Sequence, residues 1–154
     1  ILDGVVHVYN QLALLALSRG DTGGGARNVA AALALIEPAW KAAQNDVLRE
    51  ALAQTRLLQG EVAQREGRIA DATQAWNDTR ALLVADSKPE VAFDRLDPLV
   101  RALQWLGRDA EAAPYLQRLT AAGYVPLQPW PGANAAMTAR ASTRHPQHGR
   151  TDER

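Results

Sequence analysis

The chain has 154 residues, of which 47% are apolar and only 5% aromatic, and its 17 basic and 17 acidic residues give a formal net charge of zero. This length fits one domain with a buried core, and the balanced charge lacks the basic field expected of a nucleic-acid-binding protein. The absence of cysteine excludes disulfides, thiolate metal sites and cysteine nucleophiles, and it leaves the compartment open. The longest apolar run, 29–36, is far shorter than the about 20 residues of a membrane span.

The first part of the chain predicts two helices. No segment alternates like a strand, whereas Ala and Leu are abundant and favour helix, so we expect an all-α fold. The first helix is expected over 3–18, with Gly20 as the left-handed residue past its end. Residues 23–25, three glycines, are interpreted as a flexible turn, because a phosphate loop needs a preceding strand and a following Lys-Ser/Thr. The second helix is expected from Ala26, with a kink or an end at Pro38.

The middle of the chain carries several helix-start signals. Asn45 is expected to cap a helix, residues 87–90 form a capping-box sequence, and Asp97 precedes Pro98 as an N-cap carboxylate does before a first-turn proline. Four further helices are therefore predicted, over 46–66, 68–84, 98–106 and 109–122.

The C-terminal part has no helical pattern. Residues 124–131 contain three prolines and cannot continue a helix. Their large apolar residues are expected to lie extended across the last helix pair as a cap: Val125, Leu127 and Trp130. Residues 132–154 are small, polar and rich in arginine, and we expect disorder there. The predicted organisation is a helical domain over 1–131 with a Pro-rich C-terminal cap, followed by this tail.

A spacing motif recurs three times. A glycine is followed five residues later by a small residue at three of the predicted helix junctions: Gly20/Gly25, Gly67/Ala72 and Gly107/Ala112. Further large and small residues accompany the motif at matching positions: Tyr9, Leu12, Ala13, Val29 and Ala32; Gly60, Ala63, Trp76 and Thr79; Leu96, Leu99, Leu103, Leu116 and Leu119. Small residues at a crossing let two helices approach within roughly 8–10 Å.

This pattern resembles the tetratricopeptide repeat over about residues 6–124. The glycines at 20, 67 and 107 lie 47 and 40 residues apart, whereas the standard repeat has about 34 residues, so the helices or linkers must be longer here. The resemblance implies an α-solenoid of about three antiparallel helix pairs. A six-helix bundle without true repeats is the alternative.

The resemblance also implies a function and a site. It points to a non-catalytic scaffold that binds a protein or peptide in a concave groove lined by the first helix of each pair. The positions that would face this groove are His7, Asn10, Leu14, Leu17, Gln54, Leu57, Glu61, Arg65, Asp97, Arg101, Gln104 and Trp105. We expect no nucleic acid and no membrane as a partner of this segment.

The wider context is an expectation of the same kind. The chain starts at Ile1 without a methionine, so we expect a piece of a larger protein, such as a bacterial signalling regulator or kinase. Two alternative functions stay open: a regulatory domain that senses a small molecule, and a structural or self-association module. In the latter, three valines of the first helix would be exposed and promote association: Val5, Val6 and Val8.

The sequence gives only weak signals for a catalytic or metal-binding site. His145 and His148 are separated by a proline in the predicted tail, and the N-cap role expected of Asp97 removes the reason to pair it with Asp94 as catalytic acids. The serines lack nucleophile-elbow surroundings. The tail arginines have no interleaved aromatic residue for base stacking: Arg140, Arg144, Arg150 and Arg154. We therefore expect no enzyme, no metal and no cofactor.

Overall fold

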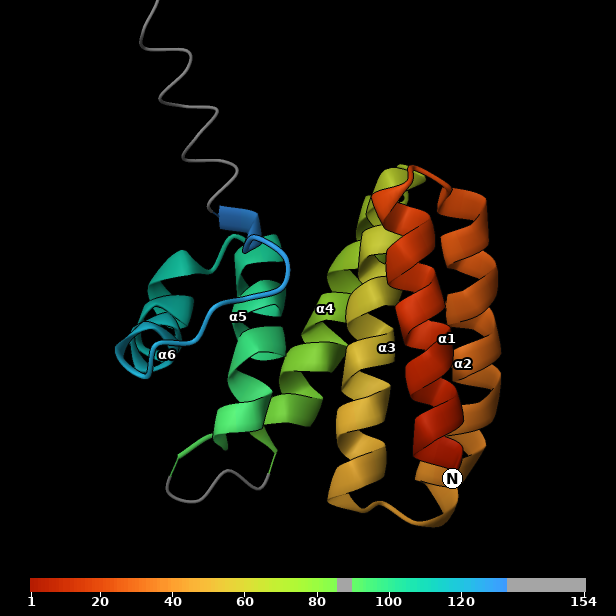
Figure 1. The fold of residues 1–154 in the computed structure, drawn as a ribbon, viewed down its shortest axis with the longest axis horizontal. Helices are drawn as coiled ribbons and strands as arrows, with labels where there is room; N and C mark the ends of the chain where they lie inside the picture. The colour runs from red at the N-terminus through yellow and green to blue at the C-terminus, as the bar shows by residue number, and fades with distance from the viewer. Residues whose placement is uncertain (86–89, 133–154) are drawn as a thin grey trace, which may run out of the picture.

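The computed structural model describes residues 1–85 and 90–132. These residues form six α-helices and one short 3₁₀-helix, with no strand in the described ranges, which confirms the all-α prediction (Figure 1). The elements are α1 (Leu2–Ser18), α2 (Thr22–Ala42), α3 (Asp46–Arg65), α4 (Ile69–Val84), η1 (Phe93–Arg95), α5 (Leu96–Trp105) and α6 (Asp109–Ala121). Most of the predicted capping box at 87–90 and the predicted tail after residue 132 lie outside the described residues.

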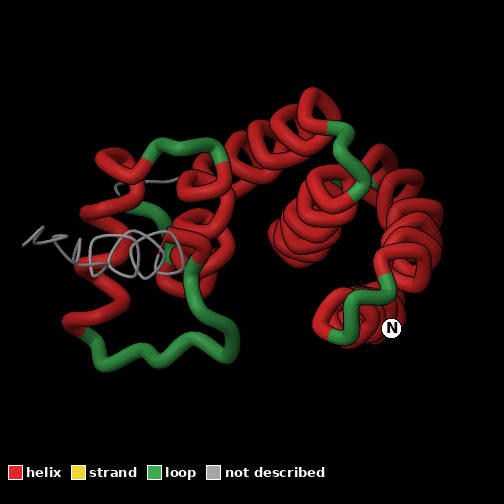
Figure 2. The backbone as a smooth tube through the Cα atoms, turned by 90° about the horizontal axis from the view of Figure 1, so that it is seen from above, coloured by secondary structure: helices red, strands yellow, loops and turns green. Residues whose placement is uncertain are grey.

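Consecutive helices pack against each other, and α3 joins the two ends of the molecule. It contacts α1 and α2 on one side and α4 and α5 on the other, while α5 contacts α6. Seen from above, the helices follow a curved path from the N-terminal pair to the opposite end, and the curve is open on one side (Figure 2). Within the described residues no helix is both long and apolar enough to cross a membrane.

Four helix ends are built in the same way around a glycine. Gly20, Gly67, Gly107 and Gly123 have φ values of +77°, +76°, +69° and +72°. In each case the amide after the glycine donates to a carbonyl five residues earlier, as Asp21 does to Ala16 at 2.9 Å. This is the Schellman arrangement, which satisfies carbonyls that the helix leaves unpaired and favours glycine at the left-handed position. The predicted ends of these helices are correct to within one residue.

The predicted turn at residues 23–25 is wrong, because these glycines form the first turn of α2. Asp21 caps that turn by accepting a hydrogen bond from the Gly24 amide at 2.7 Å. A Cβ at Gly25 would lie 2.9 Å from Leu17 Cδ2. The small residue is therefore required for close contact between α1 and α2 rather than for flexibility.

The structure decides two other sequence signals. Pro38 was expected to kink or end the second helix, and it does not end it, because α2 continues to Ala42. Asp97 is not an N-cap, because α5 already begins at Leu96, directly after the 3₁₀ turn of η1. Its carboxylate is therefore available to side chains elsewhere in the fold.

The centre of the core is a close contact between α3 and α4. A Cβ at Gly60 would overlap the indole of Trp76, so only glycine fits this position without a shift. The Trp76 indole donates to the Leu57 carbonyl at 3.3 Å and stacks on Trp105, with ring centroids 5.2 Å apart and an interplanar angle of 8°. Through this stack the second helix pair holds α5 in place beside α3.

Candidate functional site: a groove along α1, α3 and α5

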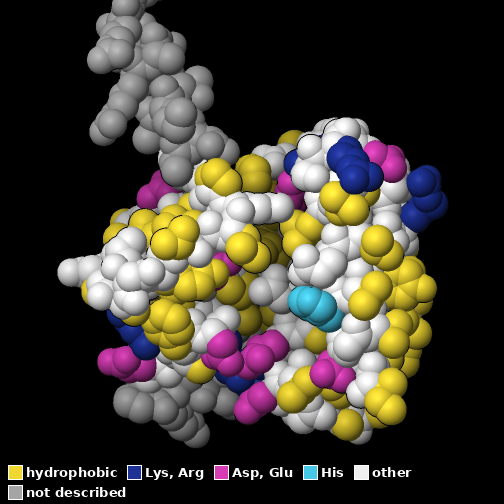
Figure 3. Space-filling view, in the orientation of Figure 1, with side chains coloured by type: hydrophobic (Ala, Val, Ile, Leu, Met, Phe, Trp, Pro, Cys, Tyr) yellow, Lys and Arg dark blue, Asp and Glu magenta, His cyan; other side chains and the backbone are white. Residues whose placement is uncertain are grey.

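One face of the molecule is hollowed. Figure 3 shows the hollow between the half that contains α1 and the half that contains α5, with hydrophobic side chains inside it. Because α3 contacts both α1 and α5, these three helices follow one another along the inner side of the curve in Figure 2. We call this face the groove.

On α1 the predicted groove residues divide between solvent and core. His7 is exposed and Leu14 is half-buried, so both offer surface to a partner. Asn10 is buried, and its Oδ1 lies 3.1 Å from the Thr55 hydroxyl of α3. Leu17 is also buried. The last two side chains therefore hold α1 in place instead of facing solvent.

On α3 only part of the predicted set is accessible. Gln54 is exposed, whereas Leu57 is buried against the core around Trp76. Arg65 pairs with Glu61 at 2.6 Å and donates a second hydrogen bond, also of 2.6 Å, to the Leu17 carbonyl at the end of α1. A guanidinium at this place satisfies a terminal carbonyl and interacts favourably with the negative end of the helix dipole.

On α5 three predicted residues act together on another part of the chain. Asp97, Arg101 and Gln104 are spaced i, i+4 and i+7 and so lie on one side of the helix. They bind residues 124–132, a segment that we call the strap. Its residues 124–130 lie outside any helix and run over α5 in Figure 1, and residues 131–132 are helical.

The strap is held largely through its backbone. Arg101 donates to the carbonyls of Gln128 at 2.7 Å and Pro129 at 3.2 Å. The Trp130 indole donates to Asp97 Oδ1 at 2.7 Å, while Asp97 Oδ2 accepts from Arg101 Nε at 2.9 Å. At the end of the strap, the amide of residue 132 donates to Gln104 Oε1 at 3.2 Å.

The apolar side chains of the strap contribute unequally. Trp130 packs with Tyr124 against the C-terminal core, at a ring separation of 6.3 Å. Val125 and Leu127 are 81% and 102% exposed, so they do not form the expected apolar cap. Burial, followed by the nearby negative charge of Asp97, raises the pKa of Tyr124 above its ordinary value of 10.0.

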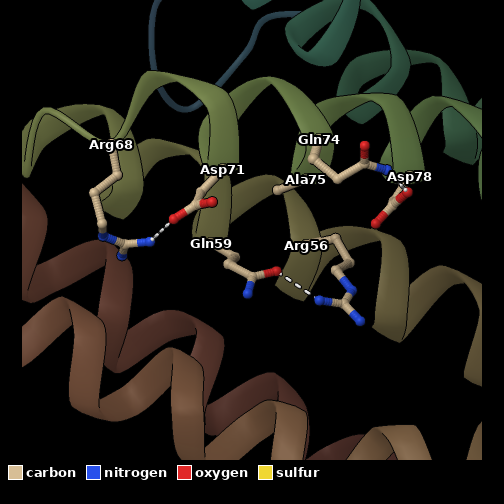
Figure 4. A pocket seen from close by; sticks show the side chains of 7 residues that line it. All are labelled: Arg56, Gln59, Arg68, Asp71, Gln74, Ala75 and Asp78. Atoms are coloured by element: carbon tan, nitrogen blue, oxygen red, sulfur yellow. Dashed lines mark hydrogen bonds and ion pairs between the residues drawn. The ribbon is translucent and has the colours of Figure 1, made fainter.

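Two surface pockets lie outside the groove. The one in Figure 4, of about 210 Å³, contains two arginines that are already paired, Arg68 with Asp71 at 2.6 Å and Arg56 with Gln59 at 2.7 Å. The other, of about 680 Å³, lies among α2, α3 and α4, and its lining includes Trp40. Among the described residues, no three His, Cys, Asp or Glu side chains gather as metal ligands.

The outer face of α1 is a surface that sequence reasoning identified only in part. Four large apolar residues on it are between 43% and 55% exposed: Val5, Val8, Leu12 and Leu15. Val6, which was expected beside them, is fully buried. Their 3-4-3 spacing is that of a helix seam, and this second apolar stripe, beside the stripe that contains Val6, was the signal in the sequence.

Comparison of the chain with protein-family models, with curated proteins and with solved structures found no match. The interpretation of the groove therefore depends on its own residues and their contacts.

Proposed function

We propose that this chain is a non-catalytic module, similar to tetratricopeptide repeats, that binds an extended protein or peptide segment in the groove. The observation that carries the proposal is the strap itself. A stretch of non-helical polypeptide already lies on α5, and the Arg101 guanidinium binds two of its backbone carbonyls. Backbone hydrogen bonds give affinity for an extended peptide, and side-chain contacts give selectivity.

The rest of the groove has the mixed character of a protein-binding surface. His7 and Gln54 are exposed, Leu14 and Trp105 are half-buried, and the Glu61–Arg65 pair lies at one end. Aromatic and apolar side chains can anchor a partner, while the polar groups orient it. The module would belong to a larger bacterial signalling or regulatory protein, as the sequence analysis expects.

A peptide selection tests this function. Random peptides displayed on phage are selected on the whole chain, and the affinities of the recovered peptides are measured by calorimetry. Gln54→Arg adds a long charged side chain inside the groove, so we expect it to weaken these peptides at least tenfold, about 1.4 kcal/mol.

The matched control is Gln74→Arg, the same change at an exposed glutamine of α4 outside the groove. It should leave the affinities unchanged. If both variants bind the selected peptides as the parent chain does, the groove is not the binding surface and the proposal is wrong.

The outer face of α1 supports a second function, self-association. Exposed apolar residues spaced as a helix seam, such as Val8 and Leu12, are typical of a surface that another helix covers. This function does not exclude the first, because His7 and Leu14 lie on a different side of α1 from the seam.

A further inference from the structure

We propose that the strap is an intramolecular ligand of α5, and that a partner peptide of the same chemistry must displace it to bind there. That chemistry is a tryptophan flanked by prolines, in a segment that is not helical up to the tryptophan, as in Gln128-Pro-Trp-Pro-Gly132. The inference rests on the proposed peptide-binding function and adds to it the class of partner and the means by which access to the groove is controlled.

The first argument is the way the strap is recognised. Arg101 binds two successive carbonyls, those of residues 128 and 129. Asp97 connects this backbone contact to a side-chain contact, because one of its oxygens orients Arg101 and the other accepts the Trp130 indole proton. A helix side that binds two consecutive carbonyls and one indole is suited to an extended segment rather than to another helix, whose carbonyls are already paired.

The second argument concerns the prolines. Pro129 has no amide hydrogen, so its binding to Arg101 through the carbonyl leaves no backbone donor of that residue unpaired. Proline also restricts the free segment to extended conformations, which lowers the entropy lost on binding. A Cβ at Gly132 would lie 2.8 Å from Gln104 Nε2, so a larger residue there would shift the Gln104 side chain, whose Oε1 accepts the hydrogen bond of residue 132.

The third argument is that the strap can leave. Val125 and Leu127 lie in solvent, and the two aromatic side chains of the strap, Tyr124 and Trp130, are only partly buried where they pack against the C-terminal core. Segments with few buried apolar contacts open at a much smaller free-energy cost than the core does. The strap therefore resembles a bound peptide more than a structural element, and its release would uncover Asp97, Arg101 and Gln104.

Because the strap belongs to the same chain as α5, a free peptide must compete with it for the side chains of α5. A tethered ligand acts at an effective concentration on the order of millimolar, so an isolated peptide with the same contacts competes poorly. A partner that also contacts the exposed groove residues of α1 and α3, such as His7 and Gln54, gains the additional affinity needed to displace the strap. The strap would thus select for partners that span the groove.

The test uses a fluorescein-labelled synthetic peptide with the sequence of residues 124–132 and measures its binding to the whole chain by fluorescence anisotropy. Trp130→Ala removes the indole contact and releases the strap, so we expect the peptide to bind this variant at least tenfold more tightly than the parent chain. Adding Arg101→Ala to Trp130→Ala should abolish that gain. Leu127→Ala, at a fully exposed strap position, is the matched control and should behave like the parent chain.

A second releasing variant makes the result independent of the aromatic cluster. Gly132→Leu crowds Gln104 without removing Trp130, and it should also increase peptide binding, while circular dichroism verifies that each variant is folded. Equal binding to the parent chain and to both releasing variants would overturn the inference, and so would no binding to any of them. Light scattering adds one more outcome that would overturn the inference. In a strap-exchanged dimer of the parent chain, the strap would be bound to a second copy and would not be an intramolecular ligand.

Failure here is distinguishable from failure of the proposed function. Peptides selected on the groove that respond to Gln54→Arg would support peptide binding even if the strap peptide never binds α5. The converse result, strap-peptide binding with no effect of Gln54→Arg, would restrict binding to α5.

Discussion

The outer faces of α1 and α6, which lie at the two ends of the row of helices, differ in how much large hydrophobic side chain they expose. On α1 the outer face is apolar and consists of Val5, Val8, Leu12 and Leu15. On α6 no large hydrophobic residue is exposed, and the outer face includes Ala113, Pro114, Gln117 and Ala121. Both helices nevertheless bury an apolar inner face, with Val6 on α1 and Leu119 on α6 at 1% exposure or less.

This difference indicates which end of the stack can accept another surface. In stacked helical arrays each pair covers its neighbour, and a terminal helix needs a polar outer face to stay soluble. α6 exposes no large hydrophobic side chain, and the strap adds polar contacts on the adjoining side of α5. α1 exposes four large hydrophobic side chains, so the N-terminal end is the one at which a second helix surface would bury apolar area.

The largest expected effect contrasts the inner face of one terminal helix with the outer face of the other. Leu119→Ala creates a cavity in the C-terminal core and should lower the free energy of unfolding by about 2–5 kcal/mol. Leu15→Ala removes a side chain that is already 46% exposed and should cost less than about 1 kcal/mol. Urea unfolding followed by circular dichroism measures both, and equal losses would mean that the outer face of α1 is covered in solution.

A smaller effect concerns association through α1. Leu12→Lys places a charge in the middle of the apolar stripe, so we expect the dissociation constant for self-association to rise about tenfold, which corresponds to about 1.4 kcal/mol. Multi-angle light scattering over a concentration series gives this constant. Ala113→Lys, the same charge on the outer face of α6, is the control and should change nothing. A parent chain that is monomeric at every concentration would contradict the idea.

The smallest effect concerns the strap and its pH dependence. Because the folded state raises the pKa of Tyr124 above 10.0, the neutral phenol contributes stability that is fully present below about pH 10 and is lost as the pH rises through the folded-state pKa. Melting temperatures measured from pH 8 to pH 11 should therefore fall more steeply for the parent chain than for Tyr124→Phe. Parallel curves would show that the phenol does not differ between the folded and unfolded states.

The sequence predicted helix ends better than it predicted side-chain roles. Gly67 and Gly107 end helices where expected, because a left-handed residue after a helix is favoured by its own lack of a Cβ. Residues 23–25 misled the prediction for a related reason. The same lack of a Cβ that suits a turn also permits the close packing of Gly25 on Leu17, and only the position of α1 decides between the two.

The groove shows the same division. Three of the predicted positions, His7, Leu14 and Gln54, lie at least partly in solvent, so they can face a partner. Asn10 and Leu57 share the helical spacing of those residues but are buried, because Thr55 and Trp76 lie against them. Periodicity defines the side of a helix, whereas the width of the exposed strip depends on how closely the neighbouring helices approach.

By itself, then, the sequence determined the helical class, the six long helices within residues 1–85 and 90–132, and most of their ends, since these depend on bonds and backbone preferences within a few residues. The tertiary structure alone decided what Asp97 and Arg101 do. They were predicted to face a partner, and they bind the strap through contacts with residues 27 to 33 positions away. Contacts over such separations depend on where the curve of helices places α5, and no local pattern in the chain contains that information.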